Sequence, residues 1–175
     1  MGAVQPSVRV ATSADATEAA RLLDAFNREF DTPTPGTEIL AARLQRLAEH
    51  PALLVLLVGD PAVGLAVVSL RPNVWFEGPV GLIDELYVAP AHRDRGLGSA
   101  LIHRIRREMA RRGVEELEID VDDVDTDAQR FYRRHGFREV DPDTGDRSRR
   151  YRGAVVDPAN TPAVNPATSA ITEYE

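Results

Sequence analysis

The spacing of hydrophobic residues in the first 50 positions predicts one strand followed by two helices. A short alternating strand begins at Ser7, and apolar residues then recur with helical spacing over residues 19–26. Prolines within residues 31–36 end this helix, because a proline in a helix interior removes a backbone hydrogen bond. The same spacing predicts a second helix from about Thr37 to Glu49.

Strand periodicity then extends over residues 52–88. Two runs of mostly aliphatic residues are joined by a Gly-Asp-Pro turn at residues 59–61, which indicates a hairpin. Residues 80–88, which read VGLIDELYV, alternate as a further strand with an acidic residue on each face. Because neighbouring strand residues point to opposite faces, Asp84 and Glu85 should not face the same side unless a bulge intervenes.

The second half of the chain predicts two more helices and further strands. A helix with apolar residues four positions apart runs from residue 97 to about Gly113, and a strand follows at residues 115–121. A short helix ends at Gly136, and residues 137–140 and 148–156 are expected to form the last strands. Six or seven strands with about four helices indicate a mixed α/β fold whose sheet is mostly antiparallel.

Length and composition predict one soluble domain with a tail. The chain has 175 residues, of which 43% are hydrophobic and 28% charged, enough for an ordinary core. We assign residues 1–156 to the domain and residues 157–175, a Pro, Ala, Asn and Thr run without periodicity, to a flexible tail. The longest apolar run, residues 52–58, is too short to cross a bilayer, so we expect a cytoplasmic protein that does not associate with membranes.

Charge and cysteine content exclude several classes of function. The formal net charge of −7 argues against nucleic-acid binding and favours a cationic partner. The chain has no cysteine, which rules out disulfides, thiol nucleophiles and cysteine-based zinc sites. Its four histidines are scattered along the sequence, so no metal site is expected.

Residues 89–101, APAHRDRGLGSAL, place two glycines at the start of a predicted helix. Free N–H groups at a helix N-terminus bind anions, and Gly96 and Gly98 would let phosphate oxygens approach closely. A turn that only reverses the chain is the alternative for an isolated Gly-x-Gly. A P-loop is absent, and a dinucleotide fingerprint fits poorly, because a long loop precedes Gly96 and Leu101 occupies the third glycine position.

This segment resembles the acyl-CoA binding signature of the GNAT superfamily of N-acyltransferases. The family pattern is Arg or Gln, two residues, Gly, any residue, then Gly or Ala, and Arg93, Gly96 and Gly98 match it. The resemblance implies a GNAT-like fold in which the parallel strands 80–88 and 115–121 lie at the centre of the sheet and splay apart to bind acyl-CoA.

A second segment, DAQRFYRRHGF, is similar to the later helix motif of the same family, with Ala128 and Tyr132 in place and Gly-Phe following. Two motifs in this order with a predicted strand between them are more specific than either one, and the resemblance covers residues 7–153. One position departs from the pattern: Asp125 stands where family members often carry asparagine.

The resemblance implies acetyl-CoA as the cofactor. The main-chain amides of the loop would bind its pyrophosphate, and an amide near Val88 would stabilise the thioester carbonyl oxygen during the reaction by about 3–4 kcal/mol. The residues implied in cofactor binding come from the strand end, the loop and the later helix: Leu86, Tyr87, Val88, Arg93, Asp94, Arg95, Gly96, Leu97, Gly98, Ser99, Asp125, Ala128 and Phe131.

The resemblance also implies the groups that transfer protons. Asp84 or Glu85 would accept the proton of the attacking amine: the family favours Asp84, whereas Glu85 has the longer reach. Tyr132 would donate a proton to the departing thiolate. The acceptor pocket would be built from Phe26, Asn27, Glu29, Phe30 and Trp75, although the aromatic residues among them could equally belong to the core.

Three functions are therefore open. The first is an N-acetyltransferase that moves an acetyl group from acetyl-CoA to a primary amine by direct attack in a ternary complex. The second is a non-catalytic acyl-CoA sensor or interaction module of the same fold, and the third is an ordinary nucleotide-binding domain. The acceptor could be a small-molecule or a peptide amine, and the resemblance also allows a homodimer.

Overall fold

The computed structural model describes residues 6–140 and 145. Within them, five strands form one mixed sheet in the order β1-β2-β3-β4-β5, and four α-helices pack around it. The strands are β1 (Val8–Val10), β2 (Leu53–Gly59), β3 (Ala62–Arg71), β4 (Val80–Val88) and β5 (Leu117–Ile119). The helices are α1 (Ala16–Glu29), α2 (Thr37–Leu47), α3 (Leu97–Arg111) and α4 (Thr126–Arg134).

The sheet is antiparallel except at its β4–β5 end. β1 to β4 pair antiparallel in sequence order, whereas residues Gly81–Ile83 of β4 pair in parallel with Leu117–Ile119 of β5. The prediction of a mostly antiparallel sheet with two neighbouring parallel strands is therefore confirmed. The prediction that both lie at its centre is wrong for the described sheet, because β5 forms its edge.

The predicted count of six or seven strands is not matched, because the described residues contain five. Of residues 137–140, only Val140 takes part in an isolated bridge, so the sequence pattern there does not become a strand. The other predicted strand, residues 148–156, lies outside the described part of the chain.

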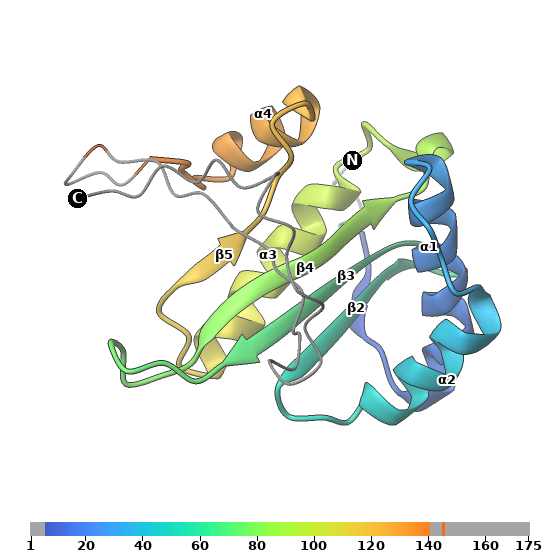
Figure 1. The fold of residues 1–175 in the computed structure, drawn as a ribbon, viewed down its shortest axis with the longest axis horizontal. Helices are drawn as coiled ribbons and strands as arrows, with labels where there is room; N and C mark the ends of the chain where they lie inside the picture. Colours follow the sequence, from blue (N-terminus) through green and yellow to red (C-terminus); the bar gives the residue numbers. More distant parts are fainter. Residues whose placement is uncertain (1–5, 141–144, 146–175) are drawn as a thin grey trace, which may run out of the picture. The chain divides into compact units, whose positions relative to one another are not determined.

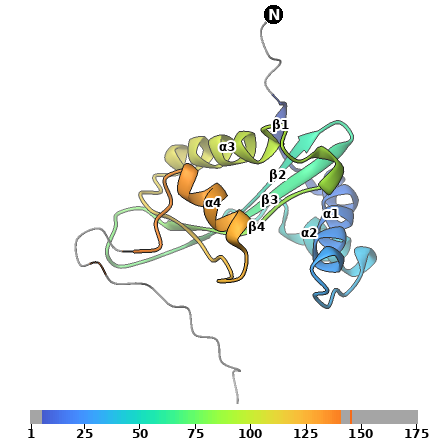
Figure 2. The same ribbon diagram turned by 90° about the horizontal axis from the view of Figure 1, so that it is seen from above.

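The two faces of the sheet are covered by different helices (Figures 1 and 2). On one face, α1 and α2 pack against apolar side chains of β2, β3 and β4 that include Leu57, Leu65 and Tyr87. On the other, α3 and α4 cover a second apolar cluster that includes Leu56 and Ile83. Each buried strand is therefore apolar on both faces, which explains the continuous hydrophobic runs in the sequence.

A β-bulge interrupts β4 at Asp84. Glu85 and Ile83 pair with consecutive residues of β3, so Asp84 between them has no partner in the ladder. An extra residue reverses the alternation of side chains beyond it. Consequently Ile83 and Leu86, three positions apart, both pack on the face of the sheet that α3 covers.

The elements described above belong to one compact unit that ends at Arg138. The second unit, residues 139–175, is described only at three positions, so the predicted boundary between residues 156 and 157 lies outside the described residues. Among the described helices, none is long and apolar enough to span a membrane. The described residues also contain no group of three or more His, Asp or Glu side chains placed to hold a metal ion.

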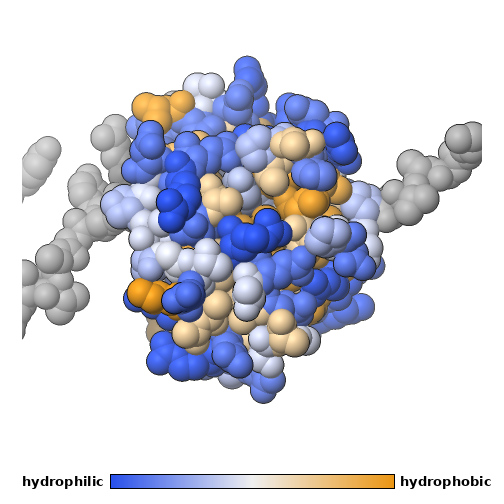
Figure 3. All heavy atoms as spheres, turned by 90° about the vertical axis from the view of Figure 1, so that its right-hand side faces the viewer, coloured by the Kyte–Doolittle hydropathy of each residue, from blue (hydrophilic) through white to orange (hydrophobic). Residues whose placement is uncertain are grey.

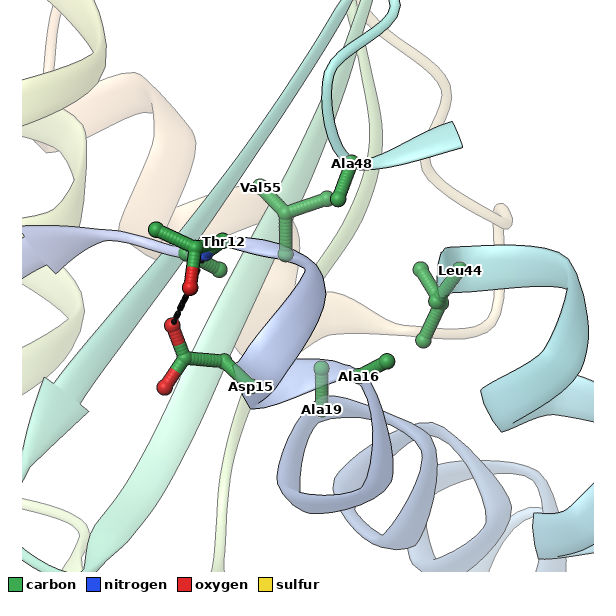
Figure 4. A pocket seen from close by; sticks show the side chains of 8 residues that line it. Thr12, Asp15, Ala16, Ala19, Leu44, Ala48 and Val55 are labelled. Carbon is green, nitrogen blue, oxygen red and sulfur yellow. Dashed lines mark hydrogen bonds between the residues drawn. The ribbon is translucent and has the colours of Figure 1, made fainter. Parts of the chain in front are cut away.

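A small pocket between α1, α2 and β2 lacks the features of a reactive site (Figure 4). Its volume is about 10 Å³, room for about one water molecule, and alanines form half of its lining. Its one ionisable side chain, Asp15, accepts hydrogen bonds from the N–H and hydroxyl of Thr12 and so closes the turn before α1. The face that carries α1 and α2 is mostly hydrophilic, with separate hydrophobic side chains (Figure 3).

Candidate active site

The main chain of β4 has an open edge beyond Ile83, because β5 pairs with β4 only as far as that residue. Ala89 donates its N–H to Val63 of β3. Since antiparallel residues face a neighbouring strand alternately, the N–H and C=O groups of Leu86 and Val88 point the other way, to the side of β5. The parallel pairing of β4 with β5 thus stops at the bulge, which is where β5 ends.

A second set of free main-chain donors lies at the start of α3. The N–H groups of residues 95–99 donate to no group in the part of the chain that the structure describes, and the first helical bond is from Ala100 to Gly96. Gly96 is the N-cap, with φ 76°, a left-handed conformation that favours glycine. A Cβ placed on Gly96 would meet nothing within 4 Å, so the space beside this residue is open.

Gly98 has a packing role in addition to the one its spacing suggests. A Cβ placed there would lie 3.1 Å from Cζ and 3.2 Å from Cε2 of Phe131. The missing side chain therefore lets the Phe131 ring of α4 pack directly on the first turn of α3. Because α4 sits this close, its residues are brought to the open edge of β4.

Glu85 and Asp84 differ in environment at the open edge. Glu85 is half-buried, and burial, together with the charge of Asp84, raises the pKa of its carboxyl group. Asp84 is exposed in the bulge. Glu85 lies two residues before Tyr87 and so shares the face of the sheet that α1 covers.

Tyr132 of α4 approaches the same edge from the opposite face. Its side chain is 8% exposed and packs in the cluster with α3. Burial is the main cause that raises the pKa of its hydroxyl well above the usual value, and the negative charges of Asp125 and Glu85 add to it. The hydroxyl therefore lies within electrostatic reach of Glu85 and keeps its proton at neutral pH.

Arg93 links the loop to α1 rather than pointing at the free amides of α3. Its Nε donates to the carbonyl oxygen of Val88 at 2.9 Å, and Nη2 lies 2.7 Å and 2.9 Å from the two carboxylate oxygens of Glu29. Its guanidinium carbon lies 5.8 Å from the centre of the Tyr87 ring. Burial is the main cause that raises the pKa of Tyr87, and the hydrogen bond from the Tyr87 hydroxyl to Glu29 adds to it.

Comparison with known proteins identifies the family. The sequence profile of the acetyltransferase (GNAT) family matches residues 18–137, which is more than half of the chain. The protein belongs to the GNAT family. The matched segment contains all but the first two residues of α1, the open edge of β4, the start of α3 and Tyr132.

Individual GNAT proteins resemble the chain to different extents. Aminoglycoside N(6')-acetyltransferase type 1 of Salmonella typhimurium (strain LT2) is 28% identical over 109 residues, covering 61% of this chain and 71% of that protein. The crystal structure of a protein assigned as an acetyltransferase, from Arthrobacter sp. FB24, has a TM-score of 0.82 at 46% identity and covers 89% of this chain and 99% of its own.

A third relative shares only the fold. AAC(6')-Iy, solved with the bisubstrate analogue CoA-S-monomethyl-acetylneamine, has a TM-score of 0.70 at 21% identity, covering 86% of this chain and 99% of its own. These similarities confirm the GNAT fold and an acyltransferase family.

The structure brings most of the residues implied by the GNAT resemblance to the open edge or the start of α3. Asp125 caps α4 by accepting the N–H of Ala128 at 2.9 Å, a role that its carboxylate performs as well as an asparagine would. Ala128 packs beside Tyr132 in the α3 cluster. Asp94 (φ 59°) and Arg95 form the exposed turn before Gly96, and Leu97 begins α3.

The predicted acceptor residues do not form one group. Phe26 and Phe30 contact each other at 5.4 Å between ring centres, and Phe26 stacks on Tyr87 at 5.1 Å, all at the end of β4 near the glycine loop. Asn27 accepts the N–H of Thr32 through its main chain. The loop before β4 lies at the opposite end of that strand (Figure 1). Trp75 belongs to this loop and is 87% exposed. The nine residues of β4 separate it from the aromatic pair by about 30 Å, so grouping Trp75 with them is wrong.

His135 is a residue of the site region for which the sequence predicted no role. Its Nε2 lies 3.0 Å from Oγ of Ser99 in the first turn of α3, and its Nδ1 lies 2.8 Å from the carbonyl oxygen of Phe131. The two residues are 36 positions apart, and neither motif of the family pattern links them. One sequence feature could have indicated this contact. His135 lies at the end of α4, and Gly98 allows that helix to pack closely on the first turn of α3.

Proposed function

We propose that the protein is an acetyl-CoA-dependent N-acetyltransferase whose acceptor is a small-molecule primary amine. The observation that carries this proposal is the presence of two sets of main-chain donors without a partner in the described residues: the amides of residues 95–99 and those of Leu86 and Val88 at the open edge of β4. The first set suits a diphosphate, and the second suits the amides and the thioester of a pantetheine arm.

Coenzyme A fits the residues present. Five consecutive N–H groups without a partner in the described residues, in front of an open space at Gly96, suit a diphosphate at the positive end of a helix dipole. When bound, the cofactor supplies an acetyl thioester that an amine can attack. The N–H of Val88, or that of Leu86, would stabilise negative charge on the thioester oxygen as a main-chain oxyanion donor.

Glu85 is our candidate for the general base. A carboxyl group whose pKa is raised holds a proton more strongly than an ordinary one, which makes it a better acceptor for the proton of an ammonium substrate near neutral pH. Glu85 lies on the α1 face of β4, so the amine would approach from that side, directly or through a water molecule. Asp84 remains the alternative that the family pattern favours.

Tyr132 is our candidate for the general acid. It approaches the edge of β4 from the α3 face, and its proton is retained at neutral pH because the pKa of its hydroxyl is raised. It would donate this proton to the sulfur of the departing thiolate. Base and acid would thus act from opposite faces of one opening in the sheet, which suits a direct transfer without a covalent enzyme intermediate. No cysteine is available for such an intermediate.

The acceptor class rests on two observations. Phe26, Phe30 and Glu29 lie at the end of α1 on the side from which an amine would reach Glu85. The matched relative from Salmonella typhimurium acts on aminoglycosides according to its name, and such molecules carry several cationic amines. The aromatic rings suit an acceptor of that kind, and the net charge of −7 would attract it.

Calorimetric titration with coenzyme A, followed by thiol detection with a panel of amines, tests the proposal. Gly96→Asp places a negative charge at the anion site and should abolish binding. Gly113→Asp is the matched control, because Gly113 has a similar φ of 70° with open space around it, at the opposite end of α3. Failure of the wild type to bind millimolar coenzyme A would overturn the proposal. Binding without thiol release from acetyl-CoA with any amine would favour the non-catalytic module.

A further inference from the structure

His135 connects the end of α4 to the first turn of α3 through both nitrogens of its ring. Nδ1 lies 2.8 Å from the carbonyl oxygen of Phe131, one turn earlier in α4. Nε2 lies 3.0 Å from the hydroxyl oxygen of Ser99. The ring also packs against that of Phe131, with 4.4 Å between ring centres.

The chemistry of these two contacts fixes the direction of the hydrogen bonds. A carbonyl oxygen only accepts, so Nδ1 carries a hydrogen and donates it to Phe131. In neutral His135, Nε2 is then an acceptor, and the hydroxyl of Ser99 must donate its hydrogen to it. In protonated His135, Nε2 carries a hydrogen and donates to Ser99, which releases the hydroxyl hydrogen for another acceptor.

Ser99 lies close to the main-chain amides that are proposed to bind the cofactor diphosphate. It is the third residue of α3, in the same turn as the free N–H groups of Leu97 and Gly98. A diphosphate is an acceptor only, so Ser99 can bond it when its hydrogen is free and cannot when that hydrogen is given to His135. The state of the imidazole therefore decides whether the turn offers a side-chain donor in addition to its amides.

We propose that His135 is a positioning residue that takes up a proton when the cofactor diphosphate binds, and thereby turns the Ser99 hydroxyl toward it. This inference rests on the proposed function, because it assumes coenzyme A at the start of α3. The added charge would also bring a cation close to the anion without direct contact. Cofactor affinity should then rise as the pH falls from 8 to 6.

Charged and titratable groups of α3 and α4 surround His135. On α3, His103 faces it with 6.2 Å between ring centres, and Arg106 donates to its main-chain oxygen. On α4, Arg133 and Arg134 precede it with exposed side chains. The three arginines repel additional positive charge at this site, whereas the C-terminal end of α4 attracts it. A bound diphosphate would shift this balance toward the protonated form.

Calorimetry with dephospho-coenzyme A tests this inference directly. The probe lacks the 3′-phosphate, so its diphosphate keeps a constant charge between pH 6 and pH 8. Binding is measured at about pH 7 in two buffers of different ionisation enthalpy, which gives the number of protons taken up. We expect a net uptake for the wild type, no uptake for His135→Gln, and a wild-type Kd that falls by up to about tenfold from pH 8 to pH 6.

Two further variants separate His135 from its neighbours. Ser99→Ala should weaken binding at pH 6 by about tenfold and much less at pH 8, where its hydroxyl is given to His135. His50→Asn, at a histidine between α2 and β2 rather than on α3 or α4, is the control and should keep both the proton uptake and the pH dependence. Equal proton uptake by the wild type and His135→Gln would overturn the inference while leaving the cofactor site intact. Absence of probe binding at any pH would instead count against the proposed function itself.

Discussion

At the scale of single residues, Tyr132 and Glu85 are the two proposed proton-transfer groups, and the fold raises the pKa values of both. Burial is the main cause for both, and each also lies near negative charge. For Tyr132 this keeps a proton available to donate. For Glu85 it makes the carboxylate a stronger base but also makes its charged form costly to bury.

Tyr132→Phe tests the acid. The phenyl ring should keep its edge-on contacts with Phe131 and Phe137, so the fold and coenzyme A binding should be retained. We expect kcat to fall by about 100-fold with little change in the acceptor KM, because the proton is needed only during transfer. Steady-state kinetics with thiol detection measure both constants. A loss of less than about threefold would show that the ring only packs.

Glu85→Gln tests the base and has an opposite effect on stability. The carboxylate must be deprotonated to act, so the acid limb of kcat/KM in the wild type should lie above the ordinary value of 4.5 and disappear in the variant, with kcat lowered about 100-fold. A raised folded pKa means that stability falls as pH rises through it, so at pH 7 Gln should raise Tm by about 1–3 °C. Asp84→Asn, in the exposed neighbour, is the control: if it carries the rate loss instead, Asp84 is the base.

The sequence could supply the candidates at this scale but not the choice between them. Alternation along VGLIDELYV assigns Asp84 and Glu85 to opposite faces, whereas the bulge places Asp84 outside the ladder. A bulge depends on pairing with β3, which no local pattern encodes. The contact of Ser99 with His135 joins two helices that are distant in sequence, so spacing could not predict it either.

At the scale of elements, Arg93 connects the loop between β4 and α3 to the end of α1. One guanidinium holds the carbonyl oxygen of Val88 at the end of β4 and the carboxylate of Glu29 at the end of α1. Its fork of donors suits these two acceptors together, which a lysine could not do with one amine. The pair is partly exposed, with 41% of the Arg93 and 26% of the Glu29 side chain accessible.

A double-mutant cycle measures this connection. Arg93→Ala, Glu29→Ala and the double variant should give a coupling of about 0.5–1 kcal/mol in the free energy of unfolding, because solvent screens a partly exposed pair. The coupling should shrink at 1 M salt. Arg93→Lys should recover at most the part of the stability that comes from the contact with the Glu29 carboxylate. Additive effects within error in low-salt urea unfolding would show that the two elements are not coupled here.

Most elements of the first 136 residues follow from the hydrophobic pattern because their periodicity is strong. The helix at Thr37 and the strand at residues 80–88 are both present, with the helix ending two residues before its expected end. The pattern failed at residues 137–140, where four residues of strand-like composition have only an isolated bridge at Val140 in the described structure. A strand needs a partner along its length, and composition alone does not provide one.

At the scale of the whole molecule, the residues of the candidate site lie on opposite faces of the sheet. The α3 and α4 face carries the proposed anion site and Tyr132, and the α1 and α2 face carries Glu85, Tyr87 and the aromatic pair. The opening beyond Ile83 is where the two faces communicate. This arrangement requires only the matched family segment, residues 18–137, which is why the domain could be recognised from two motifs within it.

The predicted boundary at residue 156 gives the last test. Residues 157–175 are rich in Pro, Ala, Asn and Thr and lack the periodic apolar positions that burial in a core requires. We therefore expect a chain ending at residue 156 to melt within about 2 °C of the full chain, a difference below about 1 kcal/mol, and to bind coenzyme A equally well. A full-length variant with this segment replaced by Gly and Ser of equal length is the control. A fall in Tm of more than about 5 °C in both variants would show that the segment packs on the domain and that the boundary is misplaced.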